Sequence, residues 1–394
     1  MTNGKLRRPY AWLAAAAALA LASLLASCSS SASSNTASSS TKVASSDVPP
    51  AVASFLAQGY KGTFSAPPKT GPAAVKGKNV WVISCGQAVA SCSVPSDAAM
   101  AAGAAAGWHM HLYDAALNPA NYTTGIDQAI ADKANGIVTV VVDCDLARAP
   151  LLQAKAAGIK TVGIDSFDCN DPLDDTGSPV YSTFVKFNGE ATAGDAFQEW
   201  DALKMAWLIA QTDGKAKVVA TYEPGFLISQ HRAVGMKDEI ALCKKCSLDL
   251  VAFSPTDLEG NGAQEKLQSA LLQNPDTNAV LIGTDSYFAQ FANAALQNVG
   301  YSHLKIMGGE CIDATVTAAI RAGGPEQACV VMPAQWEGWA AVDELNRQFA
   351  DPGSAPVDEG LGFLVVDKTH NLPASGAVQL PVNFIADYEK VWAG

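Results

Sequence analysis

The chain has 394 residues, of which 49% are hydrophobic, so it is long enough for two ordinary domains with cores of their own. Its formal net charge of -12 at pH 7 excludes the positive electrostatic surface on which nucleic-acid binding depends. After the N-terminal region, no segment offers about 18 uninterrupted apolar residues, so the sequence predicts no transmembrane helix.

The N-terminal segment has the organisation of an export signal. A positively charged start at residues 5–8 precedes an apolar run at residues 11–25, which is too short to span a bilayer comfortably. The run ends in Leu25–Cys28, the sequence LASC, which resembles a bacterial lipobox. This resemblance implies that residues 1–27 are a lipoprotein signal peptide and that Cys28 carries acyl chains. An ordinary signal peptide beside a free cysteine is the alternative.

A low-complexity stretch follows, because residues 29–46 are nearly all serine, alanine and threonine. Such a composition cannot bury enough apolar surface to fold, so we expect a flexible tether over residues 28–50. The folded part is then expected outside the cytoplasm, in the periplasm or at the outer face of the cytoplasmic membrane, and held there by the lipid anchor.

From residue 79 onward, short β-rich runs alternate with longer, often alanine-rich segments. In the first half we expect strands at 80–84, 110–113, 136–142 and 160–164, and helices at 96–106, 122–133 and 147–157. In the second half we expect strands at 217–221, 248–253, 279–283, 305–307, 328–332 and 362–366, helices at 191–211, 229–243, 262–273, 287–299, 314–322 and 336–349, and a final segment at 384–392. The alternation predicts an α/β fold with two Rossmann-like parallel-sheet lobes. A ligand is expected in a cleft beyond the carboxyl ends of the strands.

Eight cysteines follow Cys28, and an even number in an exported protein favours disulfides. Pairing of neighbours along the chain predicts four bonds: Cys85–Cys92, Cys144–Cys169, Cys243–Cys246 and Cys311–Cys329. The spacing of Cys243 and Cys246 is also that of thioredoxin-type redox centres. However, it falls at the predicted C-terminus of a helix, whereas a reactive thiolate is favoured at a helix N-terminus. We therefore prefer a structural disulfide.

The sequence gives little support for a metal site or a catalytic site. His109 and His111 share one face of a predicted strand, with Asp143 and Asp145 in a neighbouring loop, but a zinc site needs three or four converging ligands. No G-x-S-x-G elbow is present, and none of the five histidines is placed by a catalytic motif. We expect no enzymatic activity, no cofactor and no metal.

Four segments resemble the periplasmic sugar-binding family, the ribose-binding type of transporter receptors. KAAGIKTVGID at Lys155–Asp165 is similar to that family's KAAGIPVVTID, and residues 118–143 resemble its preceding helix and strand. SQHRAVGM at Ser229–Met236 resembles its R-x-x-G-F helix start, and residues 274–300 are similar to its P-D-x-x-A-V segment and the helix after it. The motifs stand in the same order and cover about residues 78–350.

The resemblance implies a type I periplasmic binding protein, in which two lobes are joined by a three-crossing hinge. The crossings would lie near Lys186, Pro333 and Asp351. The lobes would then comprise residues 78–186 plus 333–351 on the N-terminal side and residues 187–332 plus 352–394 on the C-terminal side.

The resemblance also implies ligand-contacting residues. Asp165 matches the family's strand-end aspartate, whose carboxylate accepts hydrogen bonds from sugar hydroxyls, and Glu310 stands at the aspartate position of its V-G-x-D segment. The other candidate ligand contacts are Gln87, Ser166, Gln230, Thr284, Asp285 and Trp336. Asp165 could instead cap a helix or turn, and Asp285 could cap the helix that begins near Tyr287.

By this resemblance the protein is an extracytoplasmic solute-binding lipoprotein of an ABC importer. It would bind a small polar ligand, most readily a carbohydrate, and deliver it to a membrane permease with a separate ATPase, because the chain has no Walker-type motif of its own. The family's aromatic positions in the first loop are small residues here, Ala90–Cys92, so an aromatic or other non-sugar ligand is an alternative. A receptor for a membrane sensor is another.

Overall fold

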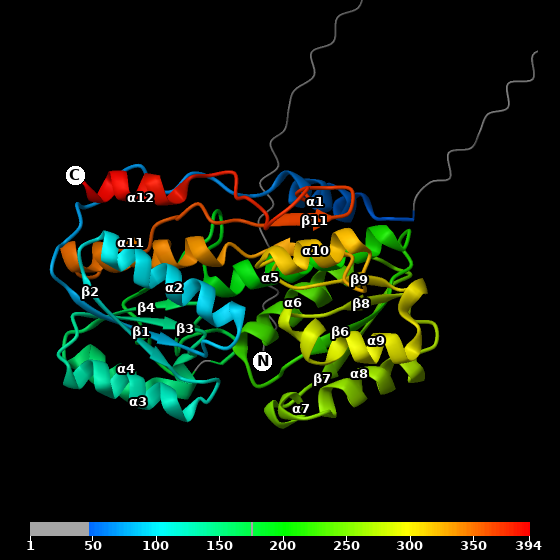
Figure 1. Ribbon diagram of the computed structural model, residues 1–394, viewed down its shortest axis with the longest axis horizontal. Helices are drawn as coiled ribbons and strands as arrows, with labels where there is room; N and C mark the ends of the chain where they lie inside the picture. The colour runs from blue at the N-terminus through cyan, green and yellow to red at the C-terminus, as the bar shows by residue number, and fades with distance from the viewer. Residues whose placement is uncertain (1–46, 175) are drawn as a thin grey trace, which may run out of the picture. The chain divides into compact units, whose positions relative to one another are not determined.

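A computed structural model describes residues 47–174 and 176–394 of the chain. The predicted signal peptide, the lipidation site Cys28 and the predicted tether up to residue 46 lie outside these residues. Within them, none of the helices combines the length and apolar character needed to cross a membrane. Two separate β-sheets, each covered by helices, organise the described part of the chain (Figure 1).

The first sheet has five parallel strands in the order β2-β1-β3-β4-β5. Its strands are β1 (Asn79–Ser84), β2 (His109–Asp114), β3 (Gly136–Val140), β4 (Lys160–Ile164) and β5 (Thr183–Phe184). Helices α2 (Ala90–Ala105) and α11 (Ala334–Ala350) cover one face, and α3 (Ala120–Ala131) and α4 (Cys144–Ala156) cover the other (Figure 1). The central strand β3 is buried along its whole length, as an inner strand between two helical layers must be. We call these elements the first lobe.

The second sheet has six strands in the order β11-β10-β9-β8-β6-β7, all parallel except β11, which is antiparallel to β10. Its strands are β6 (Lys217–Tyr222), β7 (Ser247–Ala252), β8 (Ala279–Leu281), β9 (Lys305–Met307), β10 (Ala328–Val331) and β11 (Leu364–Asp367). The helical segments that go with it are α5 (Ala193–Gln211), α6 (Leu227–Ile240), α7 (Pro255–Glu259), α8 (Gly262–Gln273), the π-helix η1 (Phe288–Ala292), α9 (Asn293–Val299), the 3-10 turn η2 (Tyr301–His303) and α10 (Ala314–Ala322). We call these elements the second lobe.

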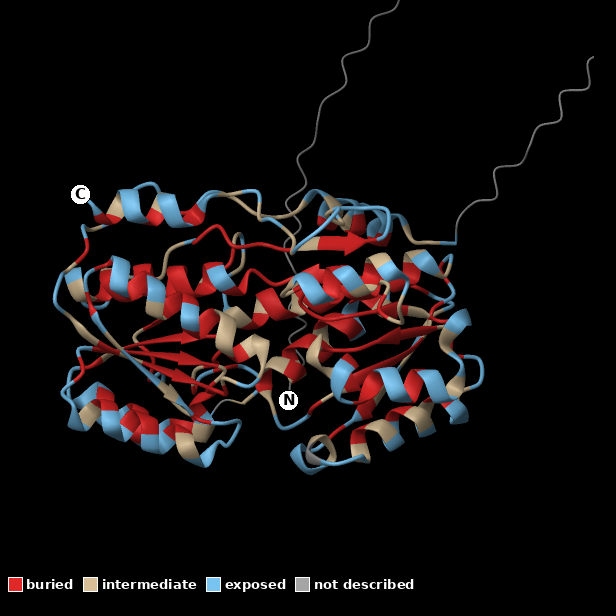
Figure 2. Ribbon diagram, in the orientation of Figure 1, coloured by how far each residue is buried: buried red, intermediate tan, exposed pale blue. Residues whose placement is uncertain are grey.

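This arrangement confirms the predicted α/β class with two parallel-sheet lobes. Figure 2 shows that burial follows the inner strands of both sheets and the inward faces of the covering helices. Helix boundaries differ from the predicted ones. In particular, α2 begins at Ala90 rather than Ser96, so Cys92 lies in the first turn of a helix and not in a loop.

The four disulfides are those predicted from neighbouring cysteines: Cys85–Cys92, Cys144–Cys169, Cys243–Cys246 and Cys311–Cys329, with Cα–Cα separations between 5.1 and 5.6 Å. Three of them include a cysteine that lies at, or a few residues after, the end of a strand. Cys85 follows β1, Cys144 follows β3 and Cys311 follows β9. A disulfide typically adds about 2–4 kcal/mol of stability by restricting the unfolded chain. Here three of the bonds fix the strand ends at which a ligand is expected.

Two terminal helices lie outside the alternating pattern. α1 (Pro50–Lys61) packs on α5 and β11 of the second lobe, and α12 (Phe384–Trp392) packs on α11 of the first lobe. The indole of Trp392 stacks on Trp339 and donates a hydrogen bond from Nε1 to Asp343 at 2.7 Å. The sequence division assigns residues 352–394 to the C-terminal lobe, but α12 makes its contacts with the other one.

The passages between the lobes run beside one another. Lys186 forms a parallel bridge with Asp358, and the Asn188 amide donates to the Leu361 carbonyl at 2.8 Å. The Thr63 amide donates to the Phe363 carbonyl at 3.0 Å. The segment between α1 and β1 is therefore hydrogen-bonded to the chain that leads into β11, a connection that the sequence did not indicate.

Candidate functional site

The carboxyl ends of β4 and β9 carry the two acidic residues singled out from the sequence. Asp165 follows β4 directly with a φ of 51°, and Cys311, the residue after Glu310, has a φ of 53°. Non-glycine residues in this left-handed region are uncommon and cluster at functional sites, where the surrounding structure must hold them. The Cys311–Cys329 disulfide supplies such a hold beside Glu310.

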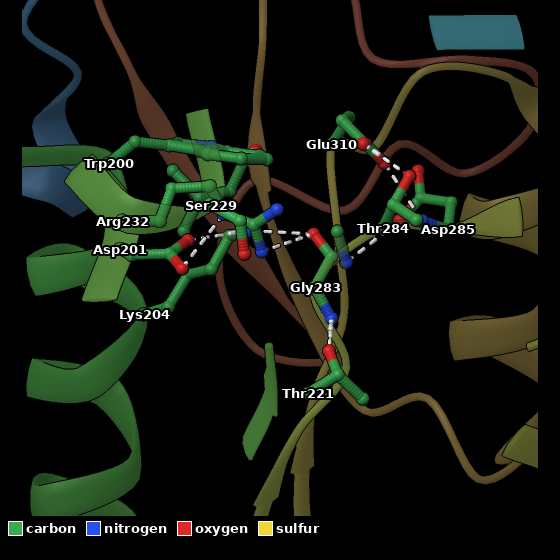
Figure 3. A network of polar contacts seen from close by, with 12 residues as sticks. Trp200, Asp201, Lys204, Thr221, Ser229, Arg232, Gly283, Thr284, Asp285 and Glu310 are labelled. Carbon is green, nitrogen blue, oxygen red and sulfur yellow. Dashed lines mark hydrogen bonds and ion pairs between the residues drawn. The ribbon is translucent and has the colours of Figure 1, made fainter. Parts of the chain in front are cut away.

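Glu310 is fixed by the loop that follows β8. The Thr284 hydroxyl donates to Glu310 Oε1 at 2.5 Å and the Asp285 amide donates to Oε2 at 2.8 Å (Figure 3). The Asp285 carboxylate in turn accepts hydrogen bonds from the amides of Gly309 at 2.8 Å and Ile312 at 3.1 Å. Asp285 therefore fastens the β9 loop and does not cap the helix near Tyr287. The three candidate ligand contacts Thr284, Asp285 and Glu310 therefore lie side by side.

A buried ionic network lies beside these loops in the second lobe. The Asp201 carboxylate lies 3.0 Å from Lys204 Nζ and 3.0 Å from Arg232 Nε, and the Asp201 and Lys204 side chains are 0% exposed. Arg232 Nη2 also donates to the Gly283 carbonyl at 2.7 Å (Figure 3). Lys204 Nζ sits 3.2 Å from the centroid of the Trp200 ring. Both cations are thus committed to Asp201, to an aromatic face and to the end of β8.

Asp165 and Glu310 come together with an acid that the sequence did not point to, Glu337 in the first turn of α11. Burial, followed by the charges of Glu310 and Asp143, raises the pKa of Asp165 to about 7. Burial, followed by the charges of Asp165 and Glu310, raises the pKa of Glu337 well above its usual value. Asp165 comes from the first lobe and Glu310 from the second, so these three acids meet where the lobes meet.

The acidic groups of this region outnumber the basic ones. Its acids are Asp143, Asp165, Asp285, Glu310, Glu326 and Glu337, and its bases are Lys204 and Arg232. Burial, more than any neighbouring charge, raises the pKa of Asp285 to about 7 and lowers that of Lys204 to about 8. The space that these side chains face therefore favours hydrogen-bond donors and positive charge.

The lobes also touch directly through side chains. The Asp143 carboxylate accepts hydrogen bonds from the Phe167 amide at 3.1 Å, within its own lobe, and from the Leu227 amide of α6 at 3.3 Å. His231 of α6 lies 2.9 Å from both carboxylate oxygens of Asp171, and its ring stacks on Phe167 at 4.8 Å. These contacts hold first-lobe loops against the second lobe.

Three further candidates from the sequence are occupied by local contacts. The Ser166 hydroxyl donates to the Ile164 carbonyl at 3.0 Å and is fully buried among first-lobe groups. Gln87 donates from its side chain to the Ser84 hydroxyl at 2.8 Å, and Gln230 donates to the Pro224 carbonyl at 3.0 Å. Gln87 and Gln230 are half-buried at the ends of β1 and α6, whereas Ser166 holds the β4 turn in place.

Trp336 is not available for stacking on a ligand, so that prediction is wrong. Its ring is fully buried and stacks on Phe384 of α12 at 5.2 Å, and its Nε1 donates to the Tyr388 hydroxyl at 3.0 Å. The physical reason is α12, which covers this side of α11 with aromatic rings. The next residue in the helix, Glu337, is the one that reaches the acidic cluster.

Metal ligands do not converge in this region of the described structure. Among residues 47–174 and 176–394, the only three candidate ligand atoms within 4.8 Å of one another come from Cys144, Asp168 and Cys169, and the two cysteines form a disulfide. His111 stacks on Trp81 at 5.0 Å, and its Nε2 lies 3.8 Å from Asp132, so it belongs to a surface contact of the first lobe.

Comparison with known proteins gives one family and many similar structures. A family model described as a periplasmic binding protein domain matches residues 92–351. Among solved structures, an ABC sugar transporter subunit from Rhodobacter sphaeroides 2.4.1 is 18% identical, with a TM-score of 0.62 over 75% of this chain and 100% of that one. No curated protein sequence matches the chain.

Two other similar structures were solved with ligands. A solute-binding protein from Burkholderia graminis C4D1M in complex with D-arabinose is 18% identical, with a TM-score of 0.60 over 75% of this chain and 96% of that one. One from Bacillus halodurans C-125 with bound myo-inositol is 16% identical, with the same TM-score and the same coverage. At these identities the likeness establishes the fold.

Proposed function

Because the chain belongs to the periplasmic binding protein family, we propose that it is the extracytoplasmic receptor of an ABC importer for a polyhydroxylated ligand. The family is one of solute-binding proteins, and the chain is accordingly a binding protein and not an enzyme. The permease and the separate ATPase that this role requires are part of the proposal. So is the lipid anchor on Cys28, which would keep the receptor near them.

The proposal rests on Asp165 and Glu310, which follow β4 and β9 in opposite lobes and are near enough for the charge of Glu310 to raise the pKa of Asp165. Ionised carboxylates only accept hydrogen bonds, so they suit the hydroxyl donors of a sugar or polyol. The similar structures solved with D-arabinose and myo-inositol support the same chemistry. In proteins built on parallel sheets, a ligand is also expected at the carboxyl ends of the strands.

The mechanism follows from the position of the two acids. A ligand that touches both can do so only when the lobes are together, so it binds the closed arrangement more tightly and shifts the population toward it. We propose that the lobes are residues 78–186 with 333–351 and residues 187–332 with 352–383, since α12 packs on the first lobe. Motion would occur at the adjacent passages near Lys186, Pro333 and Asp351.

The experiment is a thermal-shift screen of the mature protein against neutral pentoses, hexoses and polyols. A ligand at about a hundred times its Kd should stabilise the folded state by about 2.7 kcal/mol. Its affinity should fall at least about tenfold in Asp165→Asn and in Glu310→Gln, because each variant loses a charge-assisted acceptor. Asp127→Asn, an exposed acid on α3, is the matched control and should bind normally.

Two results would overturn the proposal. One is a ligand whose affinity is unchanged in both Asp165→Asn and Glu310→Gln, because the site would then lie elsewhere. The other is the absence of any binding by sugars and polyols, charged or neutral. Small-angle scattering with and without the best ligand adds an independent measure, since closure should reduce the radius of gyration.

A further inference from the structure

Glu337 is a buried acid without a hydrogen-bond partner. Its side chain is 0% exposed, and neither Oε1 nor Oε2 has a hydrogen-bond partner among the described residues. Buried carboxylates in proteins are nearly always paired or hydrogen-bonded, because leaving one unpaired in the interior is costly. Glu344, one heptad further along the same face of α11, shows the usual arrangement: it accepts hydrogen bonds from the Thr183 hydroxyl at 2.7 Å and the Val357 amide at 2.6 Å.

The charges that act on Glu337 make its position less favourable. Asp165 and Glu310 are the two charges that act on it most strongly, and both are acids. The Asp165 carboxylate likewise receives no hydrogen bond from the described part of the chain. The bases of the region cannot compensate, since Lys204 and Arg232 are held by Asp201. Both charges that act on Glu337 therefore belong to hydrogen-bond acceptors, and neither belongs to a donor.

A single metal ion does not fit the spacing. The oxygens of Asp165, Glu310 and Glu337 are not among the sets of three ligand atoms within 4.8 Å that the described residues provide. A cation that satisfies these acids must be larger than one atom and must carry several donors. An organic molecule with a protonated amine has both properties, since an ammonium group has three donors and no acceptor.

We propose that the ligand of this protein is a polyhydroxylated compound with a protonated amine, such as an amino sugar, and that Glu337 receives the ammonium group. This rests on the proposed function and specifies its ligand class. The hydroxyls of the ligand are bound by Asp165 and Glu310, which belong to opposite lobes. The ammonium supplies both the donors and the positive charge that Glu337 lacks, in a charge-assisted hydrogen bond.

The test compares matched sugars by titration calorimetry on the mature protein at pH 7. The pairs are D-glucosamine with D-glucose, D-galactosamine with D-galactose and D-mannosamine with D-mannose, and each N-acetyl derivative serves as the amine-blocked member. At least one amino sugar should bind at least about tenfold more tightly than its parent sugar and its N-acetyl form. Glu337→Gln should remove that preference, and Glu344→Gln should retain it.

The possible results are separable. If a neutral sugar binds as tightly as its amino counterpart in every pair, or if Glu337→Gln keeps the preference, the assignment of an amine falls while the receptor function stands. If no member of any pair binds but a pentose or polyol of the thermal-shift screen does, the assignment of an amine falls while the receptor function stands, and if nothing binds in either experiment, both fall. Should Glu337→Gln fold poorly, Glu337→Met in the same assay replaces it, and the melting temperature of each variant is measured first.

Discussion

Two groups of buried charges meet near the strand ends, and they are built in opposite ways. In the second lobe, Asp201 lies 3.0 Å from both Lys204 and Arg232, so its charge is balanced by opposite charges without a ligand. On the side of the first lobe, Asp165 and Glu337 have acidic neighbours and no hydrogen bond from the described residues. In our proposal, the first group of charges stabilises the fold and the second group receives the ligand.

The largest effect is expected from removing the charge of Asp201, which lies at the centre of the ionic network in the second lobe. Asp201→Asn leaves Lys204 and Arg232 buried without the carboxylate that pairs with both of them, and the loss of one partner from a buried pair costs about 3–5 kcal/mol. Urea unfolding of the ligand-free protein measures it. The exposed variant Asp127→Asn is the control and should unfold at the wild-type midpoint. A loss below about 1 kcal/mol would mean that the network contributes little to the fold.

Two acids on α11, the unpaired Glu337 and the hydrogen-bonded Glu344, allow a direct test of this difference. Glu337→Leu removes two unpaired oxygens, so it should stabilise the ligand-free protein by about 1–3 kcal/mol while abolishing amine-dependent binding. Glu344→Leu removes an acid whose oxygens are both used, and it should destabilise the protein by a similar amount, because Thr183 and Val357 lose their acceptor. Urea midpoints of the two variants should therefore move in opposite directions. Equal destabilisation would show that Glu337 is an ordinary structural acid.

Three buried acids near the strand ends also predict the pH dependence of stability. The folded-state pKa values of Asp143, Asp165 and Asp285 are raised to about 7, chiefly by burial, whereas an unfolded aspartate has a pKa of about 3.9. The folded state thus binds more protons than the unfolded state between these values. The stabilising contribution is fully present below about pH 4 and is lost as the pH rises through about 7.

Each such group changes the stability by at most about 1.4 kcal/mol per pH unit. The melting temperature of the ligand-free protein should therefore fall between about pH 5.5 and 8. Asp165→Asn should make that fall shallower, because the asparagine does not titrate. A flat profile in the wild type, or an equal slope in the variant, would contradict the assignment of raised pKa values to these acids.

The fold was accessible from the sequence because its two signals are local. The alternation of β-rich runs with helices, together with the order of the family-like segments, led to both parallel sheets. The even number of cysteines behind an export signal led to the four disulfides. Asp165 and Glu310 were singled out because they stand at positions where the family that the sequence resembles has strand-end acids.

The remaining residues of the site were hidden by complete burial. Helix α5 is buried on nearly all sides, so its apolar residues do not mark a single face. The only sequence signal of Asp201 and Lys204 is that they carry opposite charges three residues apart. Helix α11 has the same difficulty, since it is covered by the sheet, α2 and α12. The sequence could not show whether Trp336 or Glu337 faces the lobe junction.

The smallest expected effect comes from an exposed copy of the Asp201 arrangement. Asp47 also lies between two cations, 2.9 Å from Lys245 Nζ and 3.7 Å from Lys215 Nζ, but its side chain is 40% exposed. Water and salt screen such a pair, and the ordering of long side chains offsets most of its attraction. Asp47→Asn should therefore leave the urea midpoint unchanged, at low salt and at about 0.5 M salt alike. If Asp47→Asn instead destabilised the protein as much as Asp201→Asn, burial would not be what distinguishes the two networks. The ion pairs of Asp47 with the second lobe would then contribute as much to stability as the buried ion pairs of Asp201.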